Sequence, residues 1–314
     1  MINFNQILDQ LTSRPQLKLA EVYHLSKMSR PQWETFQIQW PTIPVSRRQE
    51  IMRAMVEISE SNFEVDFSPI FFISLSDTDS KVRTAAIQGL WESHDPVLVK
   101  LFGQILGHDE AVMTRAAAAI ALGQFIYYGE VEEIDPTIAK LAKQKLQETI
   151  NNTKEDVEVR RRAVESIAFS SAEKVCKIIE AAYYDEDDLM QVSAVFAMGR
   201  NADSRWIPRV LEELDNPSPA LRFEAARACG ELESIDALPK LISILHNDPD
   251  IEVQEVIVAT LGQIGGSVAR DALETCLEWD NEAIVTAAEE ALEELAVFNE
   301  SLRLFNMDEM DDDS

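Results

Sequence analysis

Residues 222–230 read RFEAARACG, and residues 191–199 (QVSAVFAMG) and 254–262 (QEVIVATLG) repeat the same pattern at intervals of 31 and 32 residues. Each copy starts with a polar residue, continues with small residues about three positions apart and ends in glycine. Small residues at this spacing lie on one face of an α-helix and allow a neighbouring helix to approach closely. The stretch therefore predicts a helix that packs against its own copies.

The same pattern recurs along most of the chain. Its first residues are Arg83, Arg115, Arg160, Gln191, Arg222, Gln254 and, in a degenerate copy, Val285, at spacings of 32, 45, 31, 31, 32 and 31. A second apolar stripe follows within each unit, as at Leu238, Leu241, Ile242 and Leu245, which is the spacing of an amphipathic helix. A helix, a turn and a helix in each repeat predict an all-α solenoid.

The units resemble HEAT repeats, and most closely the HEAT-like repeats first named for phycobilisome (PBS) lyases. Stretches such as VRTAAIQGL, TRAAAAIALG and VQEVIVATLGQIG match the family pattern VRxxAxxALG. The resemblance implies a right-handed, armadillo-like α-solenoid that holds a protein partner. It also implies that the second helices line the concave face.

The repeat pattern gives a domain organisation. We expect an amino-terminal helical cap over residues 1–44, a solenoid over residues 45–299 and an acidic tail over residues 300–314. The single long spacing predicts an insertion at about residues 129–145, and insertions of this kind often carry binding residues. Tyr127 and Tyr128, next to this insertion, are therefore secondary candidates for partner binding.

Charge limits the class of partner. The chain carries a net charge of −28, which repels phosphate backbones and anionic membrane surfaces, so we expect no nucleic acid and no membrane partner. No apolar run is long enough to span a bilayer, and the first residues lack the basic start and apolar run of a secretory signal. We expect a cytoplasmic monomer that binds a protein.

Residues for a known catalytic site are not evident. Deoxyhypusine hydroxylases resemble this chain in length and repeat count, but they bind two irons through His-Glu pairs. Here the four histidines, His24, His94, His108 and His246, precede Leu, Asp, Asp and Asn. Nucleophile, phosphate-loop and zinc-protease motifs are missing as well. We therefore predict a non-catalytic scaffold with no metal and no cofactor; the alternative is a lyase-like enzyme or chaperone that handles a bilin-bearing protein.

One row of side chains is a candidate binding surface. The second stripe of successive repeats carries Lys100, Lys145, Lys177, Arg209 and Lys240, at spacings of 45, 32, 32 and 31. We call these five residues the basic column. In an acidic chain, such a column indicates a surface that receives an acidic or extended protein segment. The alternative is that these cations pair with nearby carboxylates while their aliphatic stems cover apolar neighbours.

A second row of cations has a structural interpretation. Arg83, Arg115, Arg160 and Arg222 stand at the same position of the first helix, shortly after acidic residues that favour the helix start. We expect this row to bridge adjacent repeats. The three cysteines lie far apart in the sequence and are expected to be small core residues.

Overall fold

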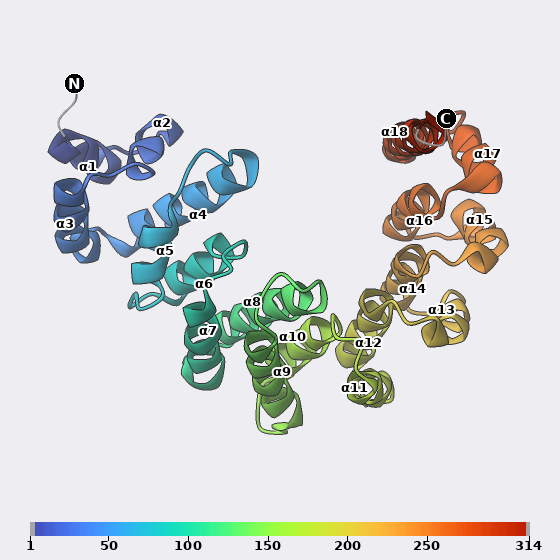
Figure 1. Ribbon diagram of the computed structural model, residues 1–314, viewed down its shortest axis with the longest axis horizontal. Coiled ribbons are helices and arrows are strands. Elements are labelled where there is room, and N and C mark those ends of the chain that lie inside the picture. The colour runs from blue at the N-terminus through green and yellow to red at the C-terminus, as the bar shows by residue number, and fades with distance from the viewer. Residues whose placement is uncertain (1–3, 312–314) are drawn as a thin grey trace. The chain divides into compact units, whose positions relative to one another are not determined.

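The computed structural model describes residues 4–311, with side chains described for residues 4–297, and every regular element among them is a helix (Figure 1). The chain divides into two compact units, residues 1–167 (unit 1) and residues 168–314 (unit 2). Within each unit, helices that follow one another in the chain stack as successive pairs. The predicted all-α solenoid of helix pairs is confirmed, while its right-handedness stays a prediction.

Unit 1 begins with helices that precede the first pair, α1 to α3, and two short 3-10 turns, η1 and η2. Its helices are α1 Phe4–Ser13, α2 Leu19–Val22, η1 Tyr23–Leu25, α3 Arg30–Gln39, η2 Trp40–Thr42, α4 Val45–Ser61, α5 Ser68–Ser74, α6 Ser80–Gly89, α7 Pro96–His108, α8 Val112–Glu130, α9 Pro136–Asn151 and α10 Val157–Ile167. From α4 onward the even-numbered helices are the first helices of the repeats. The odd-numbered ones are the second helices.

Unit 2 continues the same alternation. Its helices are α11 Glu173–Tyr183, α12 Asp188–Asn201, η3 Ser204–Trp206, α13 Ile207–Glu213, α14 Pro219–Glu231, η4 Ile235–Ala237, α15 Leu238–Asn247, α16 Ile251–Ile264, α17 Gly266–Cys276 and α18 Glu282–Asp311. Cys176, Cys229 and Cys276 are buried, as expected, and burial raises the pKa of Cys229 to about 12. These thiols are core side chains.

Aspartate and proline fix where many of the helices begin. The side chain of Asp79 accepts a hydrogen bond from the backbone N–H of Val82, and that of Asp250 accepts from Glu252 and Val253. Such N-caps satisfy donors that the first turn of a helix leaves unpaired. Proline, which needs no donor there, occupies the first turn of α7, α9 and α14. Aspartate caps and first-turn prolines therefore mark where these helices start.

The first helices of each unit pack more closely than the second helices. On α12, a Cβ added to Gly199 would lie 2.8 Å from the Cα of Ala228 on α14, and on α16 one added to Gly262 would lie 3.0 Å from the Cβ of Ala291 on α18. Consecutive second helices of unit 2 make far fewer contacts with each other. The closely packed layer lies on the inner side of its unit's curve, as α12, α14 and α16 do in unit 2 (Figure 1). The resemblance implied the opposite arrangement, which the structure corrects.

A ladder of hydrogen bonds ties five of the first helices, α6, α8, α12, α14 and α16, to the turns before them. Arg83, Arg115 and Arg222 each donate to the backbone carbonyl six residues earlier, at 2.7–2.9 Å. Gln191 and Gln254 do the same at 2.8 Å. In these five copies the polar residue at the start thus replaces a missing backbone partner in the turn, whereas Arg160 donates to the Ile150 carbonyl ten residues earlier at 3.3 Å.

The arginines of this ladder also reach the next repeat. Arg83 forms two hydrogen bonds of 2.7 Å to Asp109, and Arg222 forms two, of 2.7 and 2.9 Å, to Asp248. Burial alone would raise the pKa of Asp109 and Asp248, but hydrogen bonds from the arginines and from backbone N–H groups outweigh it and hold both below the ordinary value. The predicted bridging role of the row is thus borne out for Arg83 and Arg222, and also for Arg115, which pairs with Glu155 in the turn before α10 at 2.7 Å.

The structure fills the long repeat interval with longer helices, where the sequence predicted an added segment. α8 has 19 residues and α9 has 16, against 13 in α14 and 10 in α15. Residues 129–145 therefore span the end of α8, a turn and the first half of α9. Gly129 allows the end of α8 to lie close to α9, because a Cβ at this position would be 2.3 Å from the Cβ of Ala139.

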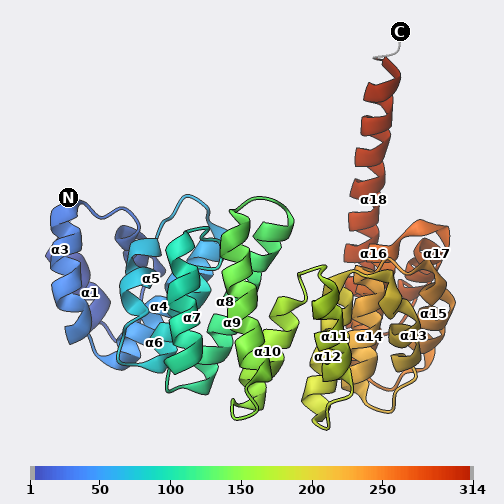
Figure 2. The same ribbon diagram turned by 60° about the horizontal axis from the view of Figure 1, so that its bottom comes forward.

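The two ends of the chain extend the repeats differently. Residues 4–42 form α1 to α3 and η2, in which Leu25, Phe36 and Trp40 are buried. At the other end, residues 300–311 continue α18, which runs past the ends of α16 and α17 (Figure 2). Residues 312–314 of the predicted acidic tail lie outside the described residues. The cap and the tail as functional segments stay predictions.

Candidate partner-binding surfaces

All five residues of the basic column lie on second helices, as predicted. In unit 1, Lys100 is on α7 and Lys145 on α9; in unit 2, Lys177, Arg209 and Lys240 are on α11, α13 and α15. Lys100 and Lys177 are exposed, and neither side chain forms an ion pair or hydrogen bond with the described residues. These two cations are available to a partner.

The other three column residues are engaged, and each contacts the second helix of the preceding repeat. The aliphatic stem of Lys145 lies over Gly103 of α7, where an added Cβ would be 3.2 Å from its Cγ, and its ammonium pairs with Glu148 at 2.8 Å. The ammonium of Lys240 lies 2.7 Å from Asp215 and donates to the Leu211 carbonyl of α13 at 2.6 Å. For these residues the pairing alternative describes the contacts.

Arg209 makes the most extensive of these contacts. Its guanidinium lies 4.8 Å from the centre of the Tyr183 ring and donates to the Tyr184 hydroxyl at 2.8 Å. Burial, together with a hydrogen bond to Glu213, raises the pKa of Tyr183 to about 12, so the phenol stays protonated and donates to that carboxylate. Cation, phenol and carboxylate thus bridge α11 and α13.

The secondary candidates Tyr127 and Tyr128 have different surroundings. Tyr128 is buried, and its ring centre lies 3.9 Å from that of His94 in the turn before α7. Tyr127 is 42% exposed and its ring lies 5.8 Å from that of Tyr128. Tyr128 is thus a packing residue, whereas Tyr127 presents part of its ring at the surface.

The first helices of unit 1 form a groove that the sequence analysis did not single out. It has a volume of about 420 Å³ and crosses α4, α6 and α8. We call it the basic groove; its lining residues are Gln49, Arg53, Val56, Ser80, Lys81, Thr84, Ala85, Gln88, Ala111, Val112 and Met113. The hydroxyls of Thr84 and Thr114, 3.1 Å apart, join α6 to α8 beside it.

The basic groove combines free cations with apolar surface. Arg53 and Lys81 are exposed, and neither side chain has an ion-pair or hydrogen-bond partner among the described residues. Met113 is 63% exposed beside them, and none of the described residues that line the groove is Asp or Glu. In a chain of net charge −28, two unpaired cations and no acidic residue among the described lining residues give this groove a locally positive lining.

Unit 2 has a groove at the corresponding place, with the opposite charge. It has a volume of about 270 Å³ and crosses α12, α14 and α16. We call it the acidic groove; it is lined by Val192, Pro219, Ala220, Phe223, Glu224, Asp250, Glu252 and Val253. Three of these residues are acidic and none is basic. The acidic groove is therefore unsuited to an acidic segment.

The four histidines do not form the His-Glu pairs by which deoxyhypusine hydroxylases bind two irons. All four histidines are exposed, and two of them are engaged with other rings, His94 with Tyr128 and His246 with Trp279. Across the part of the chain that the structure describes, no three His, Cys, Asp or Glu side chains gather in a way that could hold a metal ion. Within those same residues, no helix is long and apolar enough to cross a membrane.

Comparison with known proteins identifies two relatives, both named deoxyhypusine hydroxylase. The protein from Danio rerio is 31% identical over 109 residues, which are 33% of this chain and 34% of the relative. The protein from Candida albicans is 28% identical over 109 residues, 34% of each chain. This chain thus matches about one third of the length of these relatives.

Solved structures with a similar chain path include two repeat proteins. YibA from E. coli is 18% identical, with a TM-score of 0.47, and the match covers 90% of this chain and 98% of that one. Human deoxyhypusine hydroxylase in complex with glycerol is 15% identical, with a TM-score of 0.37, over 88% of this chain and 96% of that one.

These relatives correct one prediction. From the sequence we predicted that the chain is not an enzyme, because it lacks recognisable catalytic residues. Both sequence relatives carry the name of an enzyme, which contradicts that prediction. Packing residues dominate a repeat sequence, so the absence of a familiar motif was weak ground for excluding a reaction.

The family assignment comes from the repeats themselves. The family model of HEAT repeats matches residues 69–144, 176–261 and 207–293, which together make up more than half of the chain. The narrower phycobilisome-lyase type stays a prediction. The chain belongs to the HEAT-repeat family.

Proposed function

We propose that this chain binds an extended, acidic segment of a protein partner, and that the basic groove of unit 1 receives it. The observation that carries the proposal is the pair of unpaired cations, Arg53 and Lys81, in a groove lined by no described carboxylate. Positive potential in a groove attracts and orients an acidic ligand. The overall charge of −28 opposes the approach of any acidic chain, so attraction is confined to the short range of these two cations.

Apolar side chains give such a segment a second means of attachment. Val56, Val112 and Met113 lie in the same groove as the two cations. An extended peptide places successive side chains on opposite sides, so acidic residues can face Arg53 and Lys81 while apolar ones contact Met113. Because the groove is built on packed helices, little ordering of the protein is required when the segment binds.

The basic column remains a second proposed binding surface for an acidic segment, in addition to the basic groove. Lys100 and Lys177 support it, since both are exposed and unpaired among the described residues. Lys145, Arg209 and Lys240 already contact the preceding helix, so their replacement would disturb the repeats as well as any binding. A test of the column therefore uses Lys100 and Lys177.

A direct experiment compares the two surfaces at equal charge. The probe is a fluorescent peptide of alternating Glu and Leu, and binding is followed by fluorescence anisotropy at low ionic strength, where surface charges are least screened. We expect the double variant Arg53→Glu, Lys81→Glu to bind at least about tenfold more weakly than the wild type, which is about 1.4 kcal/mol. The matched variant Lys100→Glu, Lys177→Glu carries the same change in net charge.

The outcomes separate the alternatives. If only the groove variant loses affinity, the groove is the site; if only the column variant does, the column is the site and the groove proposal fails. Equal losses would mean that the peptide responds to the net charge of the chain and to neither surface, and both proposals would fail. Circular dichroism and thermal unfolding of each variant check that the helices stay intact.

A second candidate function is hydroxylation of deoxyhypusine, because both sequence relatives bear the name of that enzyme. The test incubates the full chain in air with ferrous iron, a reductant and a protein that contains deoxyhypusine, and measures by mass spectrometry whether one oxygen atom is added. O₂ supplies this atom, and two electrons from the reductant convert the other atom to water. Addition that depends on this chain would establish the reaction. The Danio rerio protein, treated in the same way, is the positive control. If that protein gives product and this chain does not, this candidate function is discarded.

The finer parts of the sequence-based prediction remain open to simple measurements. A lyase-like or bilin-handling function would give a tetrapyrrole absorption band in protein purified from its own host, whereas aromatic absorption alone would count against it. The monomeric state is checked by analytical ultracentrifugation, and the cytoplasmic location by fractionation.

A further inference from the structure

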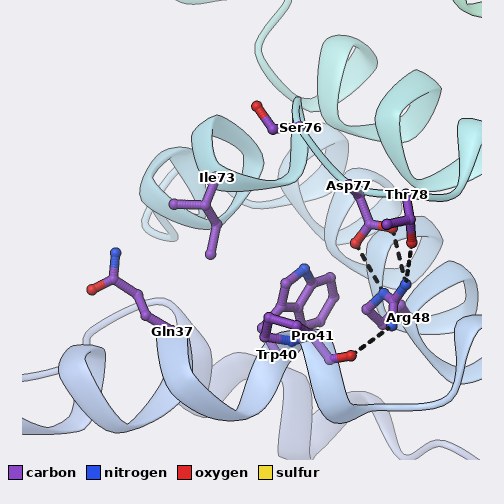
Figure 3. Close-up of a pocket in the computed structure, with 8 residues that line it drawn as sticks. All are labelled: Gln37, Trp40, Pro41, Arg48, Ile73, Ser76, Asp77 and Thr78. Carbon is purple, nitrogen blue, oxygen red and sulfur yellow. Dashed lines mark hydrogen bonds and ion pairs between the residues drawn. The ribbon is translucent and has the colours of Figure 1, made fainter.

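A separate pocket lies in unit 1 where the amino-terminal helices meet the first repeat (Figure 3). It has a volume of about 270 Å³. Gln37, Trp40 and Pro41 come from α3 and η2, Arg48 from α4, Ile73 from α5, and Asp77 from the turn before α6. None of these residues lines the basic groove or belongs to the basic column, so the pocket is a distinct feature.

An unpaired donor points into this pocket. Trp40 is 4% exposed, and its indole nitrogen has no hydrogen-bond partner among the described residues. In Figure 3 this nitrogen faces the space between Ile73 and the Arg48–Asp77 pair. The ring is held in place by stacking on Phe36, with ring centres 5.2 Å apart. A buried N–H without an acceptor is costly, so a ligand that supplies an acceptor gains affinity.

The two charged side chains of the pocket form an ion pair, in which Arg48 Nε lies 2.9 Å from an oxygen of Asp77 without making a hydrogen bond of its own. Arg48 donates to Asp77 at 3.0 Å and to the Thr78 hydroxyl at 3.4 Å, and it also donates to the backbone carbonyl of Ile43. Asp77 in turn accepts from the backbone N–H of Asp79. No spare positive charge remains in the pocket for a carboxylate or a phosphate. An anionic ligand would compete with Asp77 for Arg48.

The remaining walls are apolar. The Trp40 ring, Pro41 and Ile73 surround the indole N–H, and Gln37 lies at the exposed rim. Small-molecule sites combine an apolar lining with a few polar groups that fix orientation. The matching ligand is neutral, with one strong acceptor oxygen and a small aliphatic group.

We propose that this pocket is a binding site for a neutral amide carbonyl carried on a small aliphatic group, as in a leucine or valine residue of a peptide. The carbonyl oxygen accepts the hydrogen bond from the indole N–H of Trp40. The aliphatic group lies against Pro41 and Ile73. This site goes beyond the proposed function, since it recognises a neutral group and shares no residue with the basic groove.

The test uses N-acetyl-leucine methylamide as the probe and the full chain labelled with ¹⁵N. The five tryptophans give separate indole N–H resonances, and Trp40→Phe identifies that of Trp40. We expect a saturable shift of this resonance as probe is added, while the other indole resonances stay in place. N-acetyl-leucine, whose free carboxylate is charged, is expected to bind more weakly than the amide.

Affinity measurements on variants check the hydrogen bond itself. Binding to Trp40→Phe, followed through the backbone amides of Ser76 and Thr78, is expected to be about tenfold weaker, because one hydrogen bond is lost while the ring is kept. Trp91→Phe is the matched control, since Trp91 is 49% exposed and outside the pocket, and it should bind as the wild type does.

Two results would overturn the proposal. The first is an indole N–H resonance of Trp40 that does not move at any soluble concentration of the probe. This measurement uses the wild-type chain, so it does not depend on whether a variant folds. The second is equal affinity for Trp40→Phe and the wild type. Neither result bears on the acidic peptide, which binds elsewhere in the proposed function.

Discussion

The basic groove of unit 1 and the acidic groove of unit 2 occupy the same place in the repeat, yet they differ in charge. When Arg83 is aligned with Arg222, Lys81 of the basic groove corresponds to Ala220 of the acidic groove, and Ala85 corresponds to Glu224. In the following helix Met113 corresponds to Glu252. Two similar surfaces therefore suit ligands of opposite charge.

What the grooves share is the scaffold beneath them. The arginine next to each groove makes the same bidentate contact with the following turn, Arg83 with Asp109 and Arg222 with Asp248. Positions that pack or bond between repeats are constrained by stability, whereas exposed groove positions are not. The difference teaches that the repeat determines where a groove lies, and its exposed residues determine what it binds.

The largest expected effect tests whether the scaffold is the same under both grooves. We expect Asp109→Asn and Asp248→Asn each to lower the free energy of unfolding by about 3 kcal/mol, since each leaves a largely buried arginine without its partner. Urea unfolding measures both. Glu34→Gln, in an exposed pair with Arg30, is the control and should change stability by at most about 0.5 kcal/mol. Clearly unequal losses at the two aspartates would break the comparison.

Acid should remove the same contacts without a mutation. Asp109 and Asp248 have folded-state pKa values below their ordinary value of 3.8, so their contribution to stability is full above that pH and is lost as the pH falls through the lower, folded pKa. The gap in unfolding free energy between wild type and Asp248→Asn should therefore narrow below about pH 4. A gap that stays constant from pH 6 to pH 3 would count against the pairing.

A smaller effect separates the packed face of a first helix from its groove face. Ala225 is fully buried on α14, whereas Ala220 on the same helix is exposed in the acidic groove. Ala225→Leu should cost about 1 to 3 kcal/mol by overpacking, and Ala220→Leu should be almost silent. Thermal unfolding compares them, and equal melting temperatures would contradict the assignment of faces.

The smallest effect concerns the looser layer of second helices. Gly107 on α7 has open space where a Cβ would be added. Gly107→Ala should raise the unfolding free energy by about 0.5 to 1 kcal/mol, because alanine favours the helix and meets no neighbour. A loss of stability measured by urea unfolding would show that this layer is as tightly packed as the first helices are.

Much of the fold could be predicted from the sequence, because packing leaves a periodic record. The rows that contain Ala225, Ala228 and Gly199 recur with the repeat and form the closely packed layer. The prediction that the second helices line the concave face was wrong, although the same packing record contained the information needed to correct it. It was taken from a resemblance, although the small residues that permit close approach were visible on the first helices.

The candidate surfaces were predicted less completely. The basic column was visible as a repeat, but its engagement with preceding helices depends on single contacts such as that of Lys240 with the Leu211 carbonyl. Arg53 and Lys81 were missed because they do not recur. A comparison of exposed positions across repeats would have found them, since Lys81 stands where unit 2 has Ala220.

The most direct test of the central claim locates an acidic peptide on the chain. An alternating Glu and Leu peptide with one photoreactive leucine is cross-linked to the full protein, and the modified residues are identified by mass spectrometry. We predict adducts on α4, α6 and α8 around Val112 and Met113, which disappear in the Arg53→Glu, Lys81→Glu variant. Adducts centred on Lys100 and Lys177, or in the acidic groove of unit 2, would contradict it.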